Sequence, residues 1–191
     1  MTHSLSDVES LAAEILNPSR IFALHEIKAD PTLVPKERSA YGWWFDTSPP
    51  GVPIEKAQKL KGFHLLYVGI APSAPTSKRT LRDRLKNHCR GPIAVSTLRR
   101  SLAVLLDREL QLKVGRQFSG KLYIDQGAEA RLTAWMDQHA RVCWAITPEP
   151  WKLERHLIST GPFLPLNIKG ALHPFVPELR RMRSSVKGVQ R

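Results

Sequence analysis

Hydrophobic residues recur along this chain with two periods, which distinguish helices from strands. Apolar positions three and four apart predict helices at about residues 6–16, 77–90, 96–109, 128–139 and 148–159. Short apolar runs bounded by glycine or proline predict strands at residues 40–45, 65–70 and 142–146. The first two strands are neighbours in sequence, so a hairpin is expected. The link between them carries several prolines and is longer than a tight turn needs.

The remaining segments carry weaker patterns. Residues 18–38 contain a short candidate strand at 21–24 and two prolines, and we interpret them as an arm laid over the core. Residues 110–126 are ambiguous, and after Gly161 the pattern turns irregular and ends in a basic tail. The tryptophans Trp135, Trp144 and Trp151 fall at apolar positions of predicted elements, so they are expected in the core.

The composition adds a strong electrostatic signal. The 191 residues include 29 Lys or Arg against 17 Asp or Glu, which gives a formal charge of +12. A positive potential of this size attracts polyanions, and nucleic acid is the commonest polyanion inside a cell. The basic residues concentrate in two runs, at 78–100 and at 178–191. Such a run is often only a solvated face, but two of them in one basic chain favour contacts to phosphate.

The side chains predicted to contact a nucleic-acid backbone belong to the first run. They are Lys78, Arg79, Arg82, Lys86, Arg90, Arg99 and Arg100. The second run includes Arg180, Arg181, Arg183, Lys187 and Arg191.

Several classes of function are disfavoured by what the sequence lacks. It has no G-x-x-x-x-G-K-[ST] loop, no G-x-G-x-x-G turn and no H-E-x-x-H motif, which argues against nucleotide hydrolysis, dinucleotide redox chemistry and zinc proteolysis. Two cysteines are too few for a disulfide framework. No apolar run reaches the roughly 18 residues of a membrane span, and the N-terminus does not resemble a signal peptide. We therefore expect a cytoplasmic protein with no membrane partner.

Six polar residues within or beside the predicted elements form an ordered series. They are Tyr41, Tyr67, Arg84, His88, Glu154 and Asn167. This order resembles the GIY-YIG nuclease superfamily, over roughly residues 39 to 167. Tyr67-Val68-Gly69 matches the second triplet of that family, and Arg84 with His88 one helical turn later resembles its restriction-enzyme branch. No single motif is specific; the resemblance depends on the six positions together.

The first triplet of the family is altered here and admits two registers. Ser39-Ala40-Tyr41 keeps the tyrosine but has serine where glycine is expected, while Gly42-Trp43-Trp44 keeps the glycine but ends in tryptophan. Tryptophan offers no acid or base, so we choose the register with Tyr41. Strand alternation then puts Tyr41 on one face with Trp43 and Phe45.

The resemblance implies a role for each of the six residues in phosphodiester hydrolysis. Arg84 would be the fixed cation that holds phosphate oxygens, and Glu154 would bind Mg²⁺ or Mn²⁺ with most of the metal's ligands left to water and substrate. Tyr41 would be the general base, and Tyr67 would orient water or phosphate. His88 would tune or relay the proton, and Asn167 would support positioning. A free phenol has a pKa near 10, so the base needs help from nearby positive charge.

The same resemblance supplies the expected fold and domain limits. The fold should be α+β, with a small mixed or antiparallel sheet of about three core strands flanked by helices. Residues 1–38 would form an N-terminal helix and arm, residues 39–170 the nuclease domain, and residues 171–191 a basic tail. Within the domain, residues at about 96–139 would be a helical insertion before the third strand.

The function we expect is a metal-dependent endonuclease that hydrolyses DNA. Two alternatives remain open at this point: a DNA-binding or structural protein that keeps the fold without the reaction, and an RNA-directed relative. Nothing in the sequence supports a homodimer, although a double-strand cut would need two active sites.

Overall fold

The computed structural model of the protein describes residues 5–188, so Arg191 of the second basic run lies outside it. At its centre is a sheet in the order β1-β7-β2-β4-β3, and each neighbouring pair is antiparallel. The strands are β1 (Phe22–Ala23), β2 (Ser39–Phe45), β3 (Lys59–Leu60), β4 (Phe63–Ala71) and β7 (Ala140–Ile146). The expected α+β class and the three core strands β2, β4 and β7 are confirmed. Two-residue strands extend the sheet at both edges.

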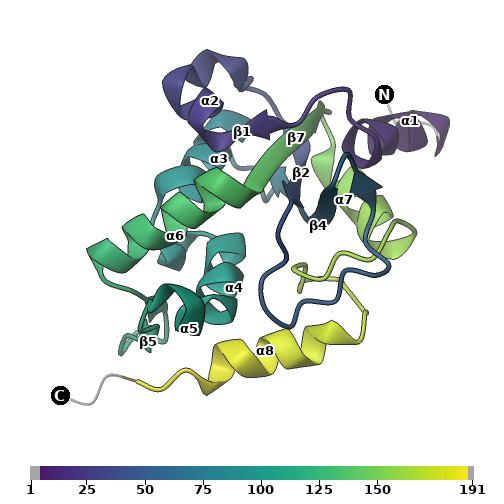
Figure 1. Cartoon of the computed structure of the whole chain (residues 1–191). Coiled ribbons are helices and arrows are strands. Elements are labelled where there is room, and N and C mark those ends of the chain that lie inside the picture. Colours follow the sequence, from purple (N-terminus) through teal and green to yellow (C-terminus); the bar gives the residue numbers. More distant parts are fainter. Residues whose placement is uncertain (1–4, 189–191) are drawn as a thin grey trace.

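Helices cover both faces of this sheet (Figure 1). The first face is covered by α1 (Leu5–Leu16) and α7 (Pro150–Ser159). The second face is covered by α2 (Leu24–Ala29), α3 (Leu81–Arg90) and α6 (Gln126–His139). Beyond them, α4 (Thr97–Leu105) packs against α6, and α5 (Asp107–Leu110) and α8 (Phe175–Ser185) pack against α4. Short 3₁₀ turns at Pro31–Leu33 and Ile93–Val95 and a hairpin of β5 (Gly115–Arg116) and β6 (Leu122–Tyr123) complete the fold. No helix within residues 5–188 is long and apolar enough to cross a lipid bilayer.

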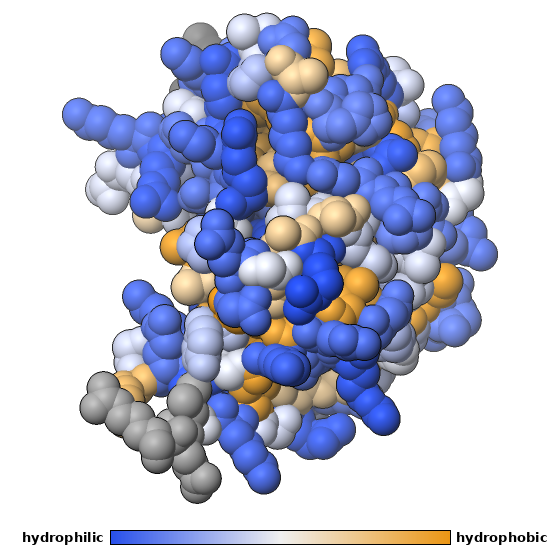
Figure 2. Space-filling view, turned by 60° about the vertical axis from the view of Figure 1, so that its left-hand side comes forward, coloured by the Kyte–Doolittle hydropathy of each residue, from blue (hydrophilic) through white to orange (hydrophobic). Residues whose placement is uncertain are grey.

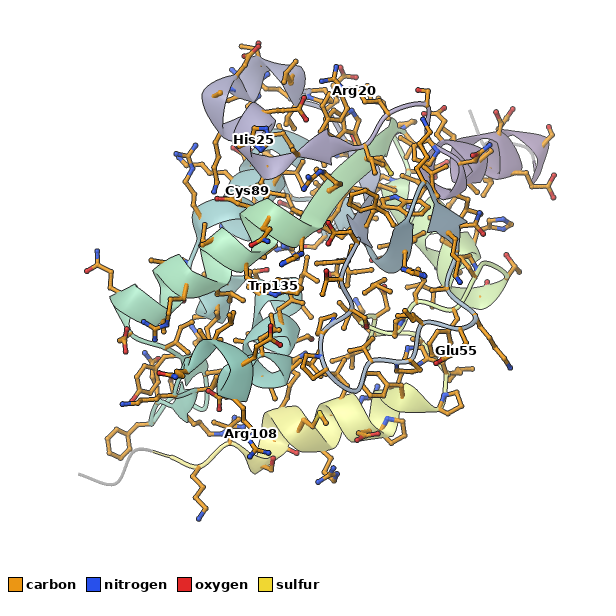
Figure 3. The ribbon with its side chains drawn as sticks, in the orientation of Figure 1. Arg20, His25, Glu55, Cys89, Arg108 and Trp135 are labelled. Atoms are coloured by element: carbon orange, nitrogen blue, oxygen red, sulfur yellow. The ribbon has the colours of Figure 1, made fainter. Side chains whose placement is uncertain are left out.

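Alternation along β2 divides the interior into two hydrophobic clusters. Tyr41, Trp43 and Phe45 point toward the second face, while Trp44 points toward the first. This is the division expected for a strand whose two sides are both buried. Trp135 of α6 joins the same cluster as Phe45 at 6.0 Å between ring centroids (Figure 3).

Two of the three tryptophans expected in the core lie at its margin instead. Trp144 and Trp151 are only partly buried. Trp144 stacks on Phe22 of the edge strand at 4.5 Å, and the guanidinium of Arg38 lies 5.8 Å from the Trp151 ring. Both indoles therefore cover the outside of the core, because they belong to elements at the edge of the layers.

The expected basic tail contains a helix. α8 packs against α4 through Phe175, Val176 and Leu179, which are buried at helical spacing (Figure 1). Three apolar positions among many arginines gave too weak a period to be recognised in the sequence. The structure also differs from the prediction near the start of the chain. The strand expected at residues 21–24 is only the two-residue β1, because α2 begins at Leu24.

Candidate active site

The site forms at the open edge of β4. Because β3 pairs only with Phe63 and His64, the later part of β4 has, among residues 5–188, no strand on the side away from β2. The segment around Asn167 takes that place: the Leu166 N–H donates to the Leu66 carbonyl at 3.0 Å. The Asn167 side chain accepts from the Val68 N–H at 2.8 Å and donates to the Val68 carbonyl at 2.9 Å. Asn167 thus satisfies the main chain of an edge strand and fixes the loop that follows it.

Helix α3 carries the basic half of the site. Thr80 caps it in a capping box with Asp83, which defines where the first turn begins. Leu81 and Leu85 are fully buried against the sheet. Arg84 and His88, one turn apart, therefore both face the tyrosine strands.

Four of the six predicted residues line one cleft of about 180 Å³. Tyr67 of β4 and Arg84 of α3 form one side, and Glu154 of α7 and Asn167 form the other. The helix α7 covers the opposite face of the sheet from α3, so the two halves meet only where the β4 edge is open. The cleft therefore brings together a phenol, a guanidinium and a carboxylate from both layers of the fold.

Tyr41 and His88 lie behind this cleft rather than in its wall. Both are 0% exposed, and Tyr41 Oη lies 2.8 Å from His88 Nε2. Arg84 Nε donates to Tyr41 Oη at 3.2 Å, and Ser96 Oγ lies 2.8 Å from His88 Nδ1. Tyr41 Oη bonds to Arg84 and His88 and does not line the cleft, so proton removal by Tyr41 stays a prediction. Tyr67 is the tyrosine that lines the cleft.

Gly69 explains the spacing of the Tyr67-Val68-Gly69 triplet. It pairs with Tyr41 across the hairpin, and a Cβ at this position would lie 2.5 Å from Tyr41 Oη. Only glycine leaves room for the phenol to cross to α3. The same geometry decides between the two registers, because Trp44 points to the other face and donates to Cys143 Sγ at 3.3 Å.

Burial and charge shift the protonation of these groups. Burial raises the pKa of both Tyr41 and Tyr67, although the nearby Arg84 opposes that effect. Burial alone would lower the pKa of Arg84, but its contacts with Tyr41 and Tyr67 raise it, so it stays charged. Burial lowers the pKa of His88, and the charges of Arg84 and Arg99 lower it further, which keeps the imidazole neutral.

Glu154 is the group in the cleft best suited to a divalent cation. Burial raises the pKa of its carboxyl despite the opposing charges of Lys169 and Arg84. Within residues 5–188 the carboxylate has neither a hydrogen bond nor an ion pair, so its oxygens are free to bind. No cluster of three or more His, Cys, Asp or Glu side chains suited to a metal occurs in this part of the chain. A lone carboxylate fits Mg²⁺, which keeps several waters, better than it fits a caged metal such as Zn²⁺.

The predicted nucleic-acid contacts differ in exposure. Lys78, Arg79, Lys86 and Arg90 are exposed, while Arg82 is half-buried with its Nε bonded to the Val34 carbonyl at 2.8 Å. Arg99 does not fit the prediction. It is 0% exposed and pairs with Glu129 at 2.7 Å. Its guanidinium also reaches the His88 carbonyl at 3.3 Å and Thr133 Oγ1 at 3.0 Å. A charge enclosed in this way supports the layer behind the cleft and cannot contact a ligand.

Sequence reasoning missed three residues at or near the cleft. Lys169 and Thr97 line it, and Arg183 of α8 lies close enough to Tyr67 for the two side chains to interact electrostatically. Lys169 stands two residues after Asn167, so the position of that asparagine was the available signal. Arg183 was expected only as a member of the second basic run, and nothing in the sequence placed it near the cleft, because its helix was not recognised.

Comparison with known proteins gives a single result. The GIY-YIG catalytic domain matches residues 39–185, which is most of the chain and includes α8. Searches of curated proteins and of solved structures found no match. The matched range contains the tyrosine hairpin, the arginine helix, the glutamate helix and the asparagine segment that together form the cleft. This protein therefore belongs to the GIY-YIG catalytic domain family, whose chemistry is nuclease-type phosphodiester hydrolysis.

Proposed function

We propose that this protein is a metal-dependent endonuclease that hydrolyses DNA at the cleft. The observation that carries the proposal is the convergence of Tyr67, Arg84 and Glu154 on one small cleft beside Asn167. Hydrolysis of a phosphodiester needs fixed positive charge against the phosphate oxygens and a group that handles the proton of the attacking water. Family membership supports the reaction class, and the net charge of +12 supports a polyanionic substrate.

Each residue of the site has a distinct task in this proposal. Arg84 holds two phosphate oxygens through its planar guanidinium, and Tyr41 fixes the orientation of that side chain. Tyr67 holds the attacking water in line with the phosphorus and accepts its proton. Because burial raises the pKa of Tyr67, the phenol is protonated at neutral pH when no further positive charge is near. A divalent cation held by Glu154 would supply that charge and stabilise the leaving oxygen.

The supporting residues keep these groups in place. His88 anchors Tyr41 from behind, and Asn167 holds the main chain at Val68, next to the residue that carries the phenol. These are positioning residues, because neither the imidazole nor the amide is free to contact a substrate.

The experiment that tests the proposal is DNA cleavage with and without metal. Supercoiled plasmid and a labelled single strand are incubated with Mg²⁺, with Mn²⁺ and with EDTA. The comparison is between wild type, Glu154→Gln and the control Glu9→Gln, which removes an equal charge from an exposed position of α1. We expect cutting only with metal, a loss of at least about a thousandfold in Glu154→Gln, and no change in Glu9→Gln. Metal-independent cutting, or full activity in Glu154→Gln, contradicts the proposal.

The alternative is a nucleic-acid-binding protein without the reaction. It is favoured by one observation, the raised pKa of both tyrosines, which leaves no ready base in the metal-free site. Such a protein would hold DNA equally well in EDTA and in Mg²⁺ and would cut it in neither. Running the same assay on an RNA strand of the same sequence separates a DNA enzyme from an RNA-directed one.

A further inference from the structure

A second, strongly basic hollow lies beside the cleft. It has a volume of about 420 Å³ and is formed by α8, α4, the β5–β6 hairpin and Ile168. Its charged lining consists of Arg100, Arg116, Arg180 and Arg183, and no acidic side chain among residues 5–188 contributes to it. We call it the arginine pocket. In Figure 1, α8 runs along the lower side of the molecule, below α4 and the hairpin.

Two of the four arginines have structural partners. Arg116 donates to the carbonyls of Gly120, Arg183, Ser184 and Val186, which ties the hairpin to the end of α8. Arg180 donates to the Ile168 carbonyl at 3.2 Å. These bonds shape the pocket, but carbonyl oxygens do not neutralise a guanidinium charge.

The other two arginines have unused hydrogen-bonding capacity. Arg183 is half-buried, and its guanidinium has no hydrogen-bond acceptor within residues 5–188. Arg100 donates one bond, to Thr97 Oγ1 at 3.2 Å, while its buried Nε has no partner in the same part of the chain. Buried donors without acceptors are costly, and two like charges brought together add repulsion. An anion in the pocket would relieve both penalties.

The arginine pocket is continuous with the cleft. Ile168 lines both, and Thr97, which lines the cleft, is the residue that holds Arg100. The positive charge of Arg84 in the cleft also acts on Arg100, and that of Arg100 acts on Arg183. Arg100 is therefore within electrostatic range of both Arg84 in the cleft and Arg183 in the pocket.

We propose that the arginine pocket binds a second phosphate of the nucleic-acid strand, next along the backbone from the one hydrolysed in the cleft. This inference rests on the proposed function, since the cleft defines which phosphate is the first. Guanidinium groups match phosphate geometry with paired hydrogen bonds and stay charged at any working pH. Figure 2 shows one face of the molecule, on which hydrophilic side chains predominate and several apolar patches lie between them.

The first test measures how salt weakens DNA binding in EDTA, where cleavage is absent. Arg183→Gln is compared with Arg181→Gln, which removes the same charge from the same helix at an exposed position beside Glu178. Loss of one phosphate contact should reduce the slope of log affinity against log salt by about 0.7 to 0.9. We expect that change in Arg183→Gln and a smaller one in Arg181→Gln. Equal changes in the two variants, or no DNA binding by wild type, overturn the inference. Thermal unfolding confirms that both variants are folded.

The second test locates the phosphate. A single uncharged methylphosphonate is moved along the oligonucleotide, and the affinity is measured for wild type and Arg183→Gln. At one position, next to the cut site, the neutral linkage should weaken binding to wild type several-fold and leave Arg183→Gln unaffected, as a double-mutant cycle requires. If no position depends on Arg183, the inference is wrong. If one linkage position depends on Arg183 but the wild type never cuts DNA, the proposed function is wrong. Phosphate binding by the arginine pocket would still stand.

Discussion

The cleft and the layer behind it contain the same kinds of side chain in opposite states. In the cleft, Tyr67, Arg84 and Glu154 face a hollow, and the carboxylate has no partner among residues 5–188. Behind it, Tyr41, His88 and Arg99 are fully buried, and each has at least one hydrogen-bonded partner. A site that must bind substrate needs unsatisfied groups, whereas the groups behind it are mostly hydrogen-bonded, although Arg99 Nε is a buried donor without a partner among residues 5–188. The sealed layer thus supplies the rigidity that the open cleft lacks.

The largest effect is expected in the sealed layer. Arg99→Met leaves the Glu129 carboxylate without its ion-pair partner, although the Ile93 N–H still donates to it, and removes the bond to the His88 carbonyl. Breaking a buried ion pair from one side typically costs about 3–5 kcal/mol of unfolding free energy. Urea unfolding monitored by tryptophan fluorescence would measure it. A loss below about 1 kcal/mol would show that Arg99 is not a support of the fold.

Removing only the hydroxyl group should have different effects at Tyr67 and at Tyr41. Tyr67→Phe is expected to reduce cleavage by about a hundredfold or more with little change in stability, because Tyr67 lines the cleft. Tyr41→Phe should cost about 1 kcal/mol of stability and less of the rate, because its hydroxyl bonds to His88 and Arg84. Single-turnover cleavage with saturating metal gives the rates. If Tyr41→Phe lowers the cleavage rate more than Tyr67→Phe does, Tyr41 is the general base.

The ionised Glu154 carboxylate should lower the free energy of unfolding at neutral pH. Its folded pKa is raised by burial, so the folded state binds the proton more tightly than the unfolded state does. Stability is therefore lost as pH rises from near the ordinary value of 4.5 through the raised folded pKa. Without metal, Glu154→Gln should melt a few degrees higher than wild type at neutral pH and no higher at pH 4. An unchanged difference across that range would contradict the burial of the charge.

The smallest effect is expected from His88. Its folded pKa lies below the ordinary 6.5, so the neutral form supports the fold above that pH and stability is lost as pH falls below it. His64 and His173 have pKa shifts in the same direction. As the pH falls, His88→Gln should therefore lose less unfolding free energy than the wild type does, but it should still lose some. Urea midpoints between pH 7.5 and 5 would show this, and an unaltered slope would mean that the imidazole is not sealed.

The sequence was sufficient for the three core strands, for most of the longer helices and for most of the cleft, for physical reasons that can be named. The α3 helix has a clear cap, a regular apolar stripe and a glycine-proline stop, and the three core strands are short apolar runs between turn residues. Tyr67, Arg84, Glu154 and Asn167 were found because their order matches a family, and chain order places them on elements that must converge.

What the sequence did not reveal depends on contacts between distant residues. Arg99 stands beside Arg100 in one basic run, yet only Arg99 is enclosed, because Glu129 thirty residues later faces it. Tyr41 was expected in the cleft, but the layer formed with Ser96 and His88 closes over it. The helix α8 was missed because its apolar stripe is only three residues wide among arginines. Local pattern carries none of these distinctions.

The segment around Asn167 has a consequence for how the chain is made. It covers the open edge of β4, yet it follows β4 by about a hundred residues, since Asn167 and Val68 are 99 positions apart. A ribosome therefore finishes β2, β4 and β7 well before the residues that cover the edge emerge. During that interval the unpaired main chain of β4 is a template on which another strand can add. The edge that becomes the active site is thus also the part of the nascent protein most exposed to aggregation.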